Sequence, residues 1–239
     1  MIKHFFLILI VCLSACEKQA ERQTSITTKK KEIKNTQVTS KQLEGKELES
    51  FLIVLEKKFA EIRSLKVDFI QEKHLEMLSK PSIGKGILCF KQPKSIRFEM
   101  TQPFHSILIV DDEKVARYER TDNNWKKLQQ GSTKVLSLVM NQITTWLQGN
   151  FREQSSIYHI SAKQSEIKTV ILTPKHKQLL TLISSIELGL NKKETRFDTV
   201  TIKEPGGDYT LLKLEKETRN PILPAKIFDT RAELPQEIK

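Results

Sequence analysis

The chain has 239 residues and carries 40 Lys and Arg against 29 Asp and Glu, which gives a formal charge of +11 at pH 7. Apolar residues make up 38% and charged residues 29%, a globular composition that excludes wholesale disorder and a fibrous repeat. Three cysteines provide no disulfide framework, and the basic surplus favours anionic partners such as phospholipid headgroups or nucleic acid.

The first sixteen residues have the pattern of an export signal. A short basic segment precedes an apolar stretch over residues 5–15, which is too short to span a hydrocarbon core that needs about 20 helical residues. The stretch ends Leu13-Ser14-Ala15-Cys16, which resembles the lipobox of bacterial lipoproteins. We therefore expect a signal peptide over 1–15 and a lipid attached to Cys16. The alternative is an ordinary secretory signal with a chance cysteine.

A polar segment follows the predicted lipidation site. Residues 17–42 carry seven basic and three acidic side chains and no aromatic residue. Such a segment cannot bury enough apolar surface to fold. We expect residues 16–42 to form a flexible basic tether between the lipid anchor and a folded domain over 43–239.

The folded part opens with a predicted amphipathic helix. Apolar residues recur every three or four positions between Leu48 and Ile62, which predicts a helix over residues 46–63. The period then changes to two, which is typical of a strand with one buried face. The apolar face of this strand is predicted to carry Val67, Phe69, Leu75 and Met77.

Further strands with turn signals fill most of the remaining chain. The predicted strands lie at about 87–90, 96–101, 106–110, 115–118, 156–162, 167–173, 182–190, 196–204 and 208–216. Residues 133–148 instead have helical spacing, with Gly149 closing the helix. Short strands with one leading and one interior helix predict a mainly β (α+β) domain, built as an antiparallel barrel or a strongly curved sheet.

The sequence gives little support to catalysis. It contains no G-x-S-x-G, H-E-x-x-H, C-x-x-C or P-loop motif, and its five histidines are dispersed. We therefore expect no enzyme, no cofactor and no metal site. Basic residues are not interleaved with aromatic ones, and the export signal points away from nucleic acid, so we expect no nucleic-acid partner.

Several blocks, in order, resemble the outer-membrane lipoprotein carrier family of LolA/LolB type. The early blocks are Ser64-Leu65-Lys66-Val67-Asp68-Phe69-Ile70-Gln71, Gly86-Ile87-Leu88-Cys89-Phe90-Lys91-Gln92-Pro93 and Arg97-Phe98-Glu99-Met100-Thr101-Gln102-Pro103. The later blocks are Leu172-Thr173-Pro174, Ile186-Glu187-Leu188 and Gly207-Asp208-Tyr209-Thr210. The resemblance covers about residues 48–230. It implies a half-open antiparallel β-barrel of about ten or eleven strands, with helices over a concave apolar face that holds lipoprotein acyl chains.

The resemblance also implies candidate site residues. The predicted lining of the lipid cavity is Phe69, Leu88, Phe90, Ile96, Phe98, Met100 and Leu108; ordinary core packing is the alternative. The predicted lid comprises Val139, Ile143, Trp146 and Leu147; an ordinary packed helix is the alternative. Arg97 is predicted to latch the lid or contact a lipid headgroup. Gln92 stands where the family usually has a basic residue, which is a departure from its pattern.

We therefore expect a lipid-anchored protein that faces the periplasm of a Gram-negative bacterium, on the outer rather than the inner membrane. It is predicted to bind acylated lipoproteins or related envelope lipids and to take part in their transport or insertion. We expect a monomer that works with a carrier or receptor protein. Two alternatives stay open at this point: a sensor module that binds mislocalised lipoproteins and signals through a protein partner, and a structural lipoprotein with a filled core.

Overall fold

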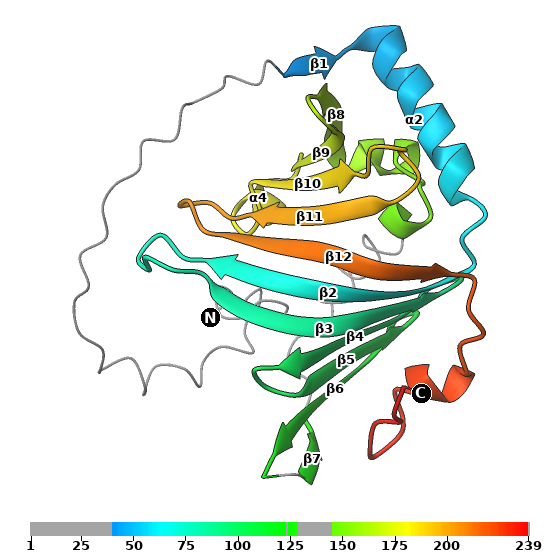
Figure 1. Cartoon of the computed structure of the whole chain (residues 1–239), viewed down its shortest axis with the longest axis vertical. Coiled ribbons are helices and arrows are strands. Elements are labelled where there is room, and N and C mark those ends of the chain that lie inside the picture. Colours follow the sequence, from blue (N-terminus) through cyan, green and yellow to red (C-terminus); the bar gives the residue numbers. More distant parts are fainter. Residues whose placement is uncertain (1–39, 123, 129–144, 239) are drawn as a thin grey trace.

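The structure is a computed structural model that describes residues 40–122, 124–128 and 145–238. Within these residues, twelve strands form one antiparallel sheet in the order β1-β8-β9-β10-β11-β12-β2-β3-β4-β5-β6-β7. Figure 1 shows the sheet strongly curved, with β1 at the top and β7 at the bottom of the view. The order ends at β1 and β7, so the predicted half-open antiparallel fold is confirmed, with twelve strands in the described residues.

The strands fall into two runs along the chain. The first run contains β2 (Ser64–His74), β3 (Ser82–Lys91), β4 (Ser95–Gln102), β5 (Ser106–Asp111), β6 (Lys114–Thr121) and β7 (Asn124–Lys127). The second contains β8 (Tyr158–Gln164), β9 (Lys168–Pro174), β10 (Ser185–Leu190), β11 (Phe197–Lys203) and β12 (Tyr209–Arg219). Antiparallel pairing of β12 with β2 joins the two runs. The edge strand β1 (Lys41–Leu43) begins two residues before the predicted start of the folded domain.

The leading helix, α2 (Gly45–Phe59), packs its apolar side against one face of the sheet. Its buried residues are Phe51, Leu52, Leu55 and Phe59. The prediction that the helix continues to residue 63 is wrong, because the chain must already turn into β2. Asn220 Oδ1 accepts hydrogen bonds from the backbone N–H groups of Arg63 and Ser64 (2.8 and 3.3 Å), which fixes this turn.

Both faces of the sheet are buried over part of their area. The inner face is the one that packs with α2, and its apolar cluster runs from β8 through β2 to β6. The outer face is covered over β3–β6 by the C-terminal segment, residues 220–238, which includes the short 3₁₀ helix η2 (Ala225–Phe228). The outer cluster consists of Cys89, Ile107, Ile109, Ala116, Tyr118, Leu223, Ile227 and Phe228.

Hydrogen bonds to the backbone fasten the C-terminal segment to the outer face. The Tyr118 hydroxyl donates to the carbonyl of Ala232 (2.6 Å), and Lys127 Nζ donates to the same oxygen (3.0 Å). Lys91 Nζ donates to the carbonyl of Leu223 (3.2 Å). Side chains of three strands therefore hold an irregular segment in place, and a simple alternation pattern does not predict this cover.

The apolar face of β2 ends earlier than predicted. The strand stops at His74, and Met77 lies in the following turn with 86% of its side chain exposed. The inward positions after Phe69 are instead the polar residues Gln71 and Lys73, which are 6% and 2% exposed. The inner face is therefore apolar at one end of β2 and polar at the other.

Cys89 provides a probe of the outer face, because it is fully buried under the C-terminal segment. Burial raises the pKa of its thiol from 9.0 to about 11, which lowers the thiolate fraction near pH 7 by about 100-fold. We expect N-ethylmaleimide to modify Cys89 at least about 100-fold more slowly in the folded chain than in urea. Peptide mass mapping after timed quenching measures both rates, and equal rates would contradict this burial.

Candidate functional site

The structure brings the seven predicted cavity residues together on the inner face. They are Phe69, Leu88, Phe90, Ile96, Phe98, Met100 and Leu108, and each is at most 8% exposed. They come from four neighbouring strands, β2 to β5, so the apolar surface is continuous across the sheet. A cavity lining and an ordinary core both require this placement, so the lipid-binding role stays a prediction.

Glycine shapes the middle of this surface. The rings of Phe69 and Phe98 are stacked, with centroids 4.5 Å apart and an interplanar angle of 20°. Gly86 of β3 lies opposite Phe69, and a Cβ on Gly86 would be 2.4 Å from Phe69 Cζ. The missing side chain therefore lets the Phe69 ring lie across β3 toward β4. The Phe69 ring therefore packs over the sheet and adds to its inner apolar surface.

The described end of the predicted lid also packs on the inner face. Trp146 and Leu147 are 4% and 9% exposed and belong to the same apolar cluster. The Trp146 ring meets Tyr158 edge to face at 6.3 Å, and burial raises the pKa of Tyr158 to about 12. Val139 and Ile143 lie outside the described residues. Movement of the segment as a lid stays a prediction.

The helical turn that carries Trp146 ends as predicted at Gly149. The Gly149 N–H donates to the carbonyl of Trp146 and the Asn150 N–H to that of Thr145, both at 3.0 Å, and Gly149 has a φ of 76°. This pairing is the Schellman ending, in which a left-handed residue, usually glycine, caps the helix. It fixes how Trp146 meets the sheet.

The predicted role of Arg97 is wrong in this structure. Its guanidinium lies on the outer face, where Nε and Nη2 donate to Glu99 Oε2 (2.9 and 2.6 Å) and Nη1 donates to the carbonyl of Ile227 (3.2 Å). Strand alternation is the reason, because Arg97 stands between the inward residues Ile96 and Phe98. Arg97 therefore fastens the C-terminal segment rather than a lid.

The contact between barrel and lid segment instead involves the turn after β3. Gln148 Nε2, just after the helical turn, donates to the carbonyl of Pro93 (3.1 Å). Gln92, at the position where the family usually has a basic residue, donates from Nε2 to the carbonyl of Ile62 (2.9 Å). Gln92 thus braces the connection between α2 and β2, and Gln148 is a contact residue that the sequence did not indicate.

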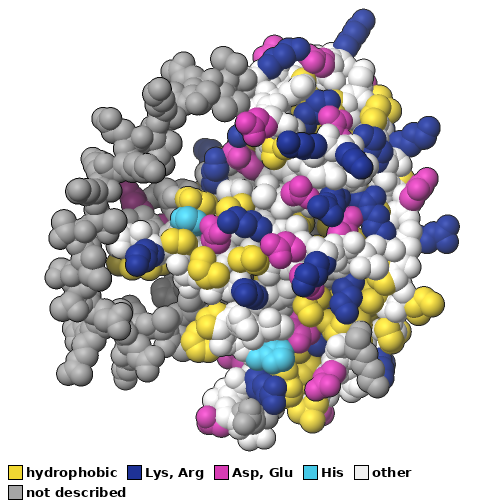
Figure 2. Space-filling model, in the orientation of Figure 1, with side chains coloured by type: hydrophobic (Ala, Val, Ile, Leu, Met, Phe, Trp, Pro, Cys, Tyr) yellow, Lys and Arg dark blue, Asp and Glu magenta, His cyan; other side chains and the backbone are white. Residues whose placement is uncertain are grey.

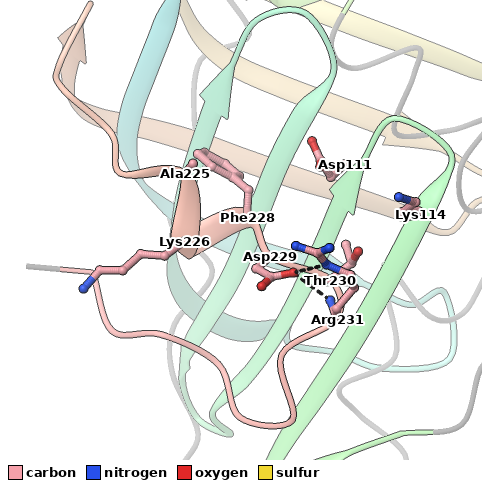
Figure 3. Close-up of a pocket in the computed structure, with 8 residues that line it drawn as sticks. All are labelled: Asp111, Lys114, Ala225, Lys226, Phe228, Asp229, Thr230 and Arg231. Atoms are coloured by element: carbon pink, nitrogen blue, oxygen red, sulfur yellow. Dashed lines mark hydrogen bonds and ion pairs between the residues drawn. The ribbon is translucent and has the colours of Figure 1, made fainter.

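Clefts on the outer side have a different character. One of about 390 Å³ lies between the β5–β6 turn and the C-terminal segment (Figure 3). Its side chains are largely polar, Lys226 points away from the rest, and Asp229 is bound to Arg231. Hydrogen bonds from the Arg231 backbone and side chain lower the pKa of Asp229. A cleft lined in this way does not suit an acyl chain.

The outer face of the second run carries paired charges. Figure 2 shows basic and acidic side chains interspersed over this part of the molecule. Glu187 of β10 lies between Lys203 (2.6 Å) and Lys163 (3.2 Å). Burial alone would raise the pKa of Glu187, but hydrogen bonds from these two lysines lower it. The pairing leaves this face charged and solvent-facing.

The lowered pKa of Glu187 predicts a pH dependence of stability. The ionised carboxylate contributes stability above its ordinary pKa of 4.5, and that contribution is lost as the pH falls through the lowered value. We expect Glu187→Gln to reduce the free energy of unfolding near pH 7 by about 1 kcal/mol or less. The free energy of unfolding of this variant should also fall less steeply as the pH is lowered. Urea titrations from pH 7 to about pH 2.5 measure the free energy of unfolding at each pH. If it fell equally steeply with pH in the wild-type chain and in the variant, the prediction would be contradicted.

The comparison with known families agrees with this architecture. Residues 60–231 match the family model described as outer membrane lipoprotein carrier protein LolA. The chain belongs to this family. The predicted resemblance is thereby confirmed, and membership of a family of carriers agrees with the prediction that the chain is not an enzyme.

Curated relatives of this family match part of the chain. The outer-membrane lipoprotein carrier protein of Salmonella paratyphi B is 30% identical over 86 residues, which cover 34% of this chain and 42% of that protein. The protein of the same description from Salmonella typhi matches equally. The chain therefore spans less than half the length of these relatives.

Solved structures of similar arrangement include three bacterial proteins. A LolA superfamily protein from Nitrosomonas europaea is 13% identical with a TM-score of 0.40, covering 74% of this chain and 97% of that one. The Mycobacterium tuberculosis lipoprotein LppX is 13% identical with a TM-score of 0.40, covering 73% and 98%. The MucA/MucB complex of Pseudomonas aeruginosa gives 10% identity and a TM-score of 0.42, covering 77% and 61%.

In residues 40–122, 124–128 and 145–238, no three or more His, Cys, Asp or Glu side chains are grouped so as to hold a metal ion. No helix among them has the length and apolar composition to cross a membrane.

Proposed function

We propose that this protein binds the acyl chains of lipoproteins or related envelope lipids on its inner face, without covalent chemistry, and takes part in their transport or insertion at the outer membrane. The observation that carries the proposal is the continuous apolar surface of β2–β5, with the Phe69 and Phe98 rings laid along it and Trp146 packed on the same side. Membership of the lipoprotein carrier family supports it.

The energetics of such binding suit a carrier. Each buried CH₂ group contributes about 0.8 kcal/mol, so a single long acyl chain contributes on the order of 10 kcal/mol before the costs of association. No charge has to be desolvated along the apolar part of the surface. The lipid is therefore held tightly and can be handed over when the segment that carries Trp146 and Leu147 moves away.

The proposed location follows from the sequence rather than from the described residues. Lipidation at Cys16 and a tether over 16–42 would hold the domain at one membrane, facing the periplasm of a Gram-negative bacterium. A tether of this length spans a few tens of ångströms on average, which favours reception or insertion at one membrane over shuttling between two. A soluble carrier or a receptor protein would then be the exchange partner.

Two adjacent residues of β5 test the proposed face. Leu108 points to the inner face and Ile109 to the outer face, and they are 7% and 1% exposed. We expect Leu108→Asn to weaken binding of a pyrene-labelled fatty acid at least about tenfold, and Ile109→Asn to change it less than about twofold. Both variants lose some stability, so fluorescence titrations are made at a temperature where both are folded. Equal losses of affinity would contradict the proposal.

A further inference from the structure

One end of the inner face is polar, although the face as a whole is apolar. The inward residues of β2 change from Leu65, Val67 and Phe69 to Gln71 and Lys73 along the strand. The paired positions on β12 change in the same direction, from Leu214 and Leu212 to Thr210. Burying polar groups costs stability unless they are bonded. A surface that only had to hold hydrocarbon would not need them.

Lys73 has hydrogen-bonding capacity that the described residues do not use. Its side chain is 2% exposed, and Nζ is paired with Glu204, which follows β11. Among the described residues, this carboxylate is the only hydrogen-bond partner of Nζ. A lysine ammonium carries three N–H donors. The pairing with Glu204 neutralises the buried charge and leaves donors for another acceptor.

Thr210 stands directly opposite Lys73 across the β12–β2 pair, so both side chains lie on the inner face. It is 3% exposed, and its Oγ1 has no hydrogen-bond partner among the residues that the structure describes. Buried hydroxyls are nearly always bonded in folded proteins. Thr210, which carries an unbonded hydroxyl, is paired with Lys73, whose ammonium has spare donors; together they indicate a place for an oxygen acceptor that the described residues do not provide.

We propose that Lys73 and Thr210 form a polar site that binds the ester carbonyl oxygens of an acyl lipid whose chains lie on the apolar part of the inner face. This assignment rests on the proposed function and gives the bound lipid a direction: the ester group at Lys73 and the chain ends toward Leu65. Glu204 already balances the charge of Lys73, so a neutral acceptor fits the site better than a phosphate, which would bring an unbalanced buried charge.

The test compares lipids that differ only at the ester. The full chain, carrying Cys16→Ser to prevent acylation, is purified without detergent and titrated with a pyrene-labelled diacylglycerol. Its matched dialkylglycerol ether has the same chains without carbonyl groups. We expect the diacylglycerol to bind about tenfold more tightly than the ether, because two hydrogen bonds are made only by the ester.

Thr210→Val is the deciding variant, because it keeps the side-chain shape and removes the hydroxyl. We expect the preference for ester over ether to fall to within about threefold, with an unchanged or raised urea midpoint. Thr169→Val is the control, since Thr169 is 8% exposed and lies on the opposite face from its neighbour Val170. Thr169→Val should keep the full preference for the ester lipid over the ether lipid.

The outcomes separate this proposal from the function on which it rests. Equal affinity of the wild-type chain for ester and ether, or a full preference surviving in Thr210→Val, would overturn the ester site and leave acyl binding intact. Tighter binding of pyrene-labelled phosphatidic acid than of diacylglycerol would replace the ester site by a phosphate site, and so overturn it too. Failure to bind either neutral lipid would overturn the proposed function itself.

Discussion

Replacing Arg97 with Met is expected to lower the free energy of unfolding by about 3–5 kcal/mol, because it leaves the Glu99 carboxylate buried without its main partner. Arg97 is 1% exposed, and its guanidinium donates twice to Glu99 and once to the backbone of Ile227. His105 Nε2 lies 2.8 Å from the other Glu99 oxygen, and this contact alone does not replace a guanidinium. Urea unfolding followed by circular dichroism measures the loss.

Arg117 of β6, which is separated from β4 by β5, provides a control. It pairs with Glu119 in the same i, i+2 relation, but the two side chains are 21% and 38% exposed. Exposed pairs contribute about 0.2–1 kcal/mol, so Arg117→Met should cost no more than that. The double variant Arg97→Met/Glu99→Met should recover part of the loss, because it removes the unpaired charge. Equal, small losses of unfolding free energy in Arg97→Met and Arg117→Met would contradict the stabilising role of the buried Arg97–Glu99 pair.

Substituting Gly86 with Ala is expected to cost about 1–3 kcal/mol or more through overpacking, and to disturb the lipid-binding surface. The added Cβ would lie 2.2 Å from the backbone carbonyl oxygen of Glu99 and 2.4 Å from Phe69 Cζ. The first contact requires β3 and β4 to separate, and the second moves Phe69 off the Phe98 ring. Calorimetric unfolding measures the stability, and pyrene-lipid titration measures the surface.

Gly45→Ala separates the effect of space from that of backbone conformation. Gly45 has a φ of 51°, but a Cβ there has no atom within 4 Å. Gly45→Ala should lower the free energy of unfolding by about 1–2 kcal/mol, which is the cost of placing alanine in the left-handed conformation. Its lipid affinity should not change. If Gly86→Ala lost no more stability than this and kept its affinity, the close packing of Phe69 over β3 would not matter for binding.

The inner face was predictable from the sequence because its residues follow simple rules. Alternation with a period of two places Ile96, Phe98 and Met100 on one side of β4, and the order of the family-like blocks supplied the fold. The same rules explain why the prediction for Arg97 was wrong. Arg97 and Glu99 lie on the other side of β4, and the alternation pattern predicts that this polar side faces solvent.

That polar side is buried by contacts that a local pattern does not encode. The C-terminal segment has no regular period, yet Ile227 and Phe228 lie on the outer face more than a hundred residues after β4. Only long-range packing decides that such a segment covers Arg97. The prediction of an arginine facing a lid or a headgroup failed for this reason.

The polar end of the inner face was present in the sequence but was not recognised. Lys73 has the same strand parity as Phe69, which places it on the inner side. Leu75 and Met77 share that parity and suggested an apolar continuation, whereas the strand ends at His74. The pairing of Lys73 with Thr210 depends on the register between β2 and β12, which is set by strands far apart in the chain.

Native mass spectrometry of the full chain shows whether the inner face holds an acyl chain. The chain carries Cys16→Ser and is purified from the periplasm without detergent. We expect a co-purified acyl-bearing species, which the Leu108→Asn variant loses and the Ile109→Asn variant keeps. A chain that shows only its bare mass, even after incubation with diacylglycerol and acylated peptides, would contradict this expectation and would mean that the inner face is a filled core.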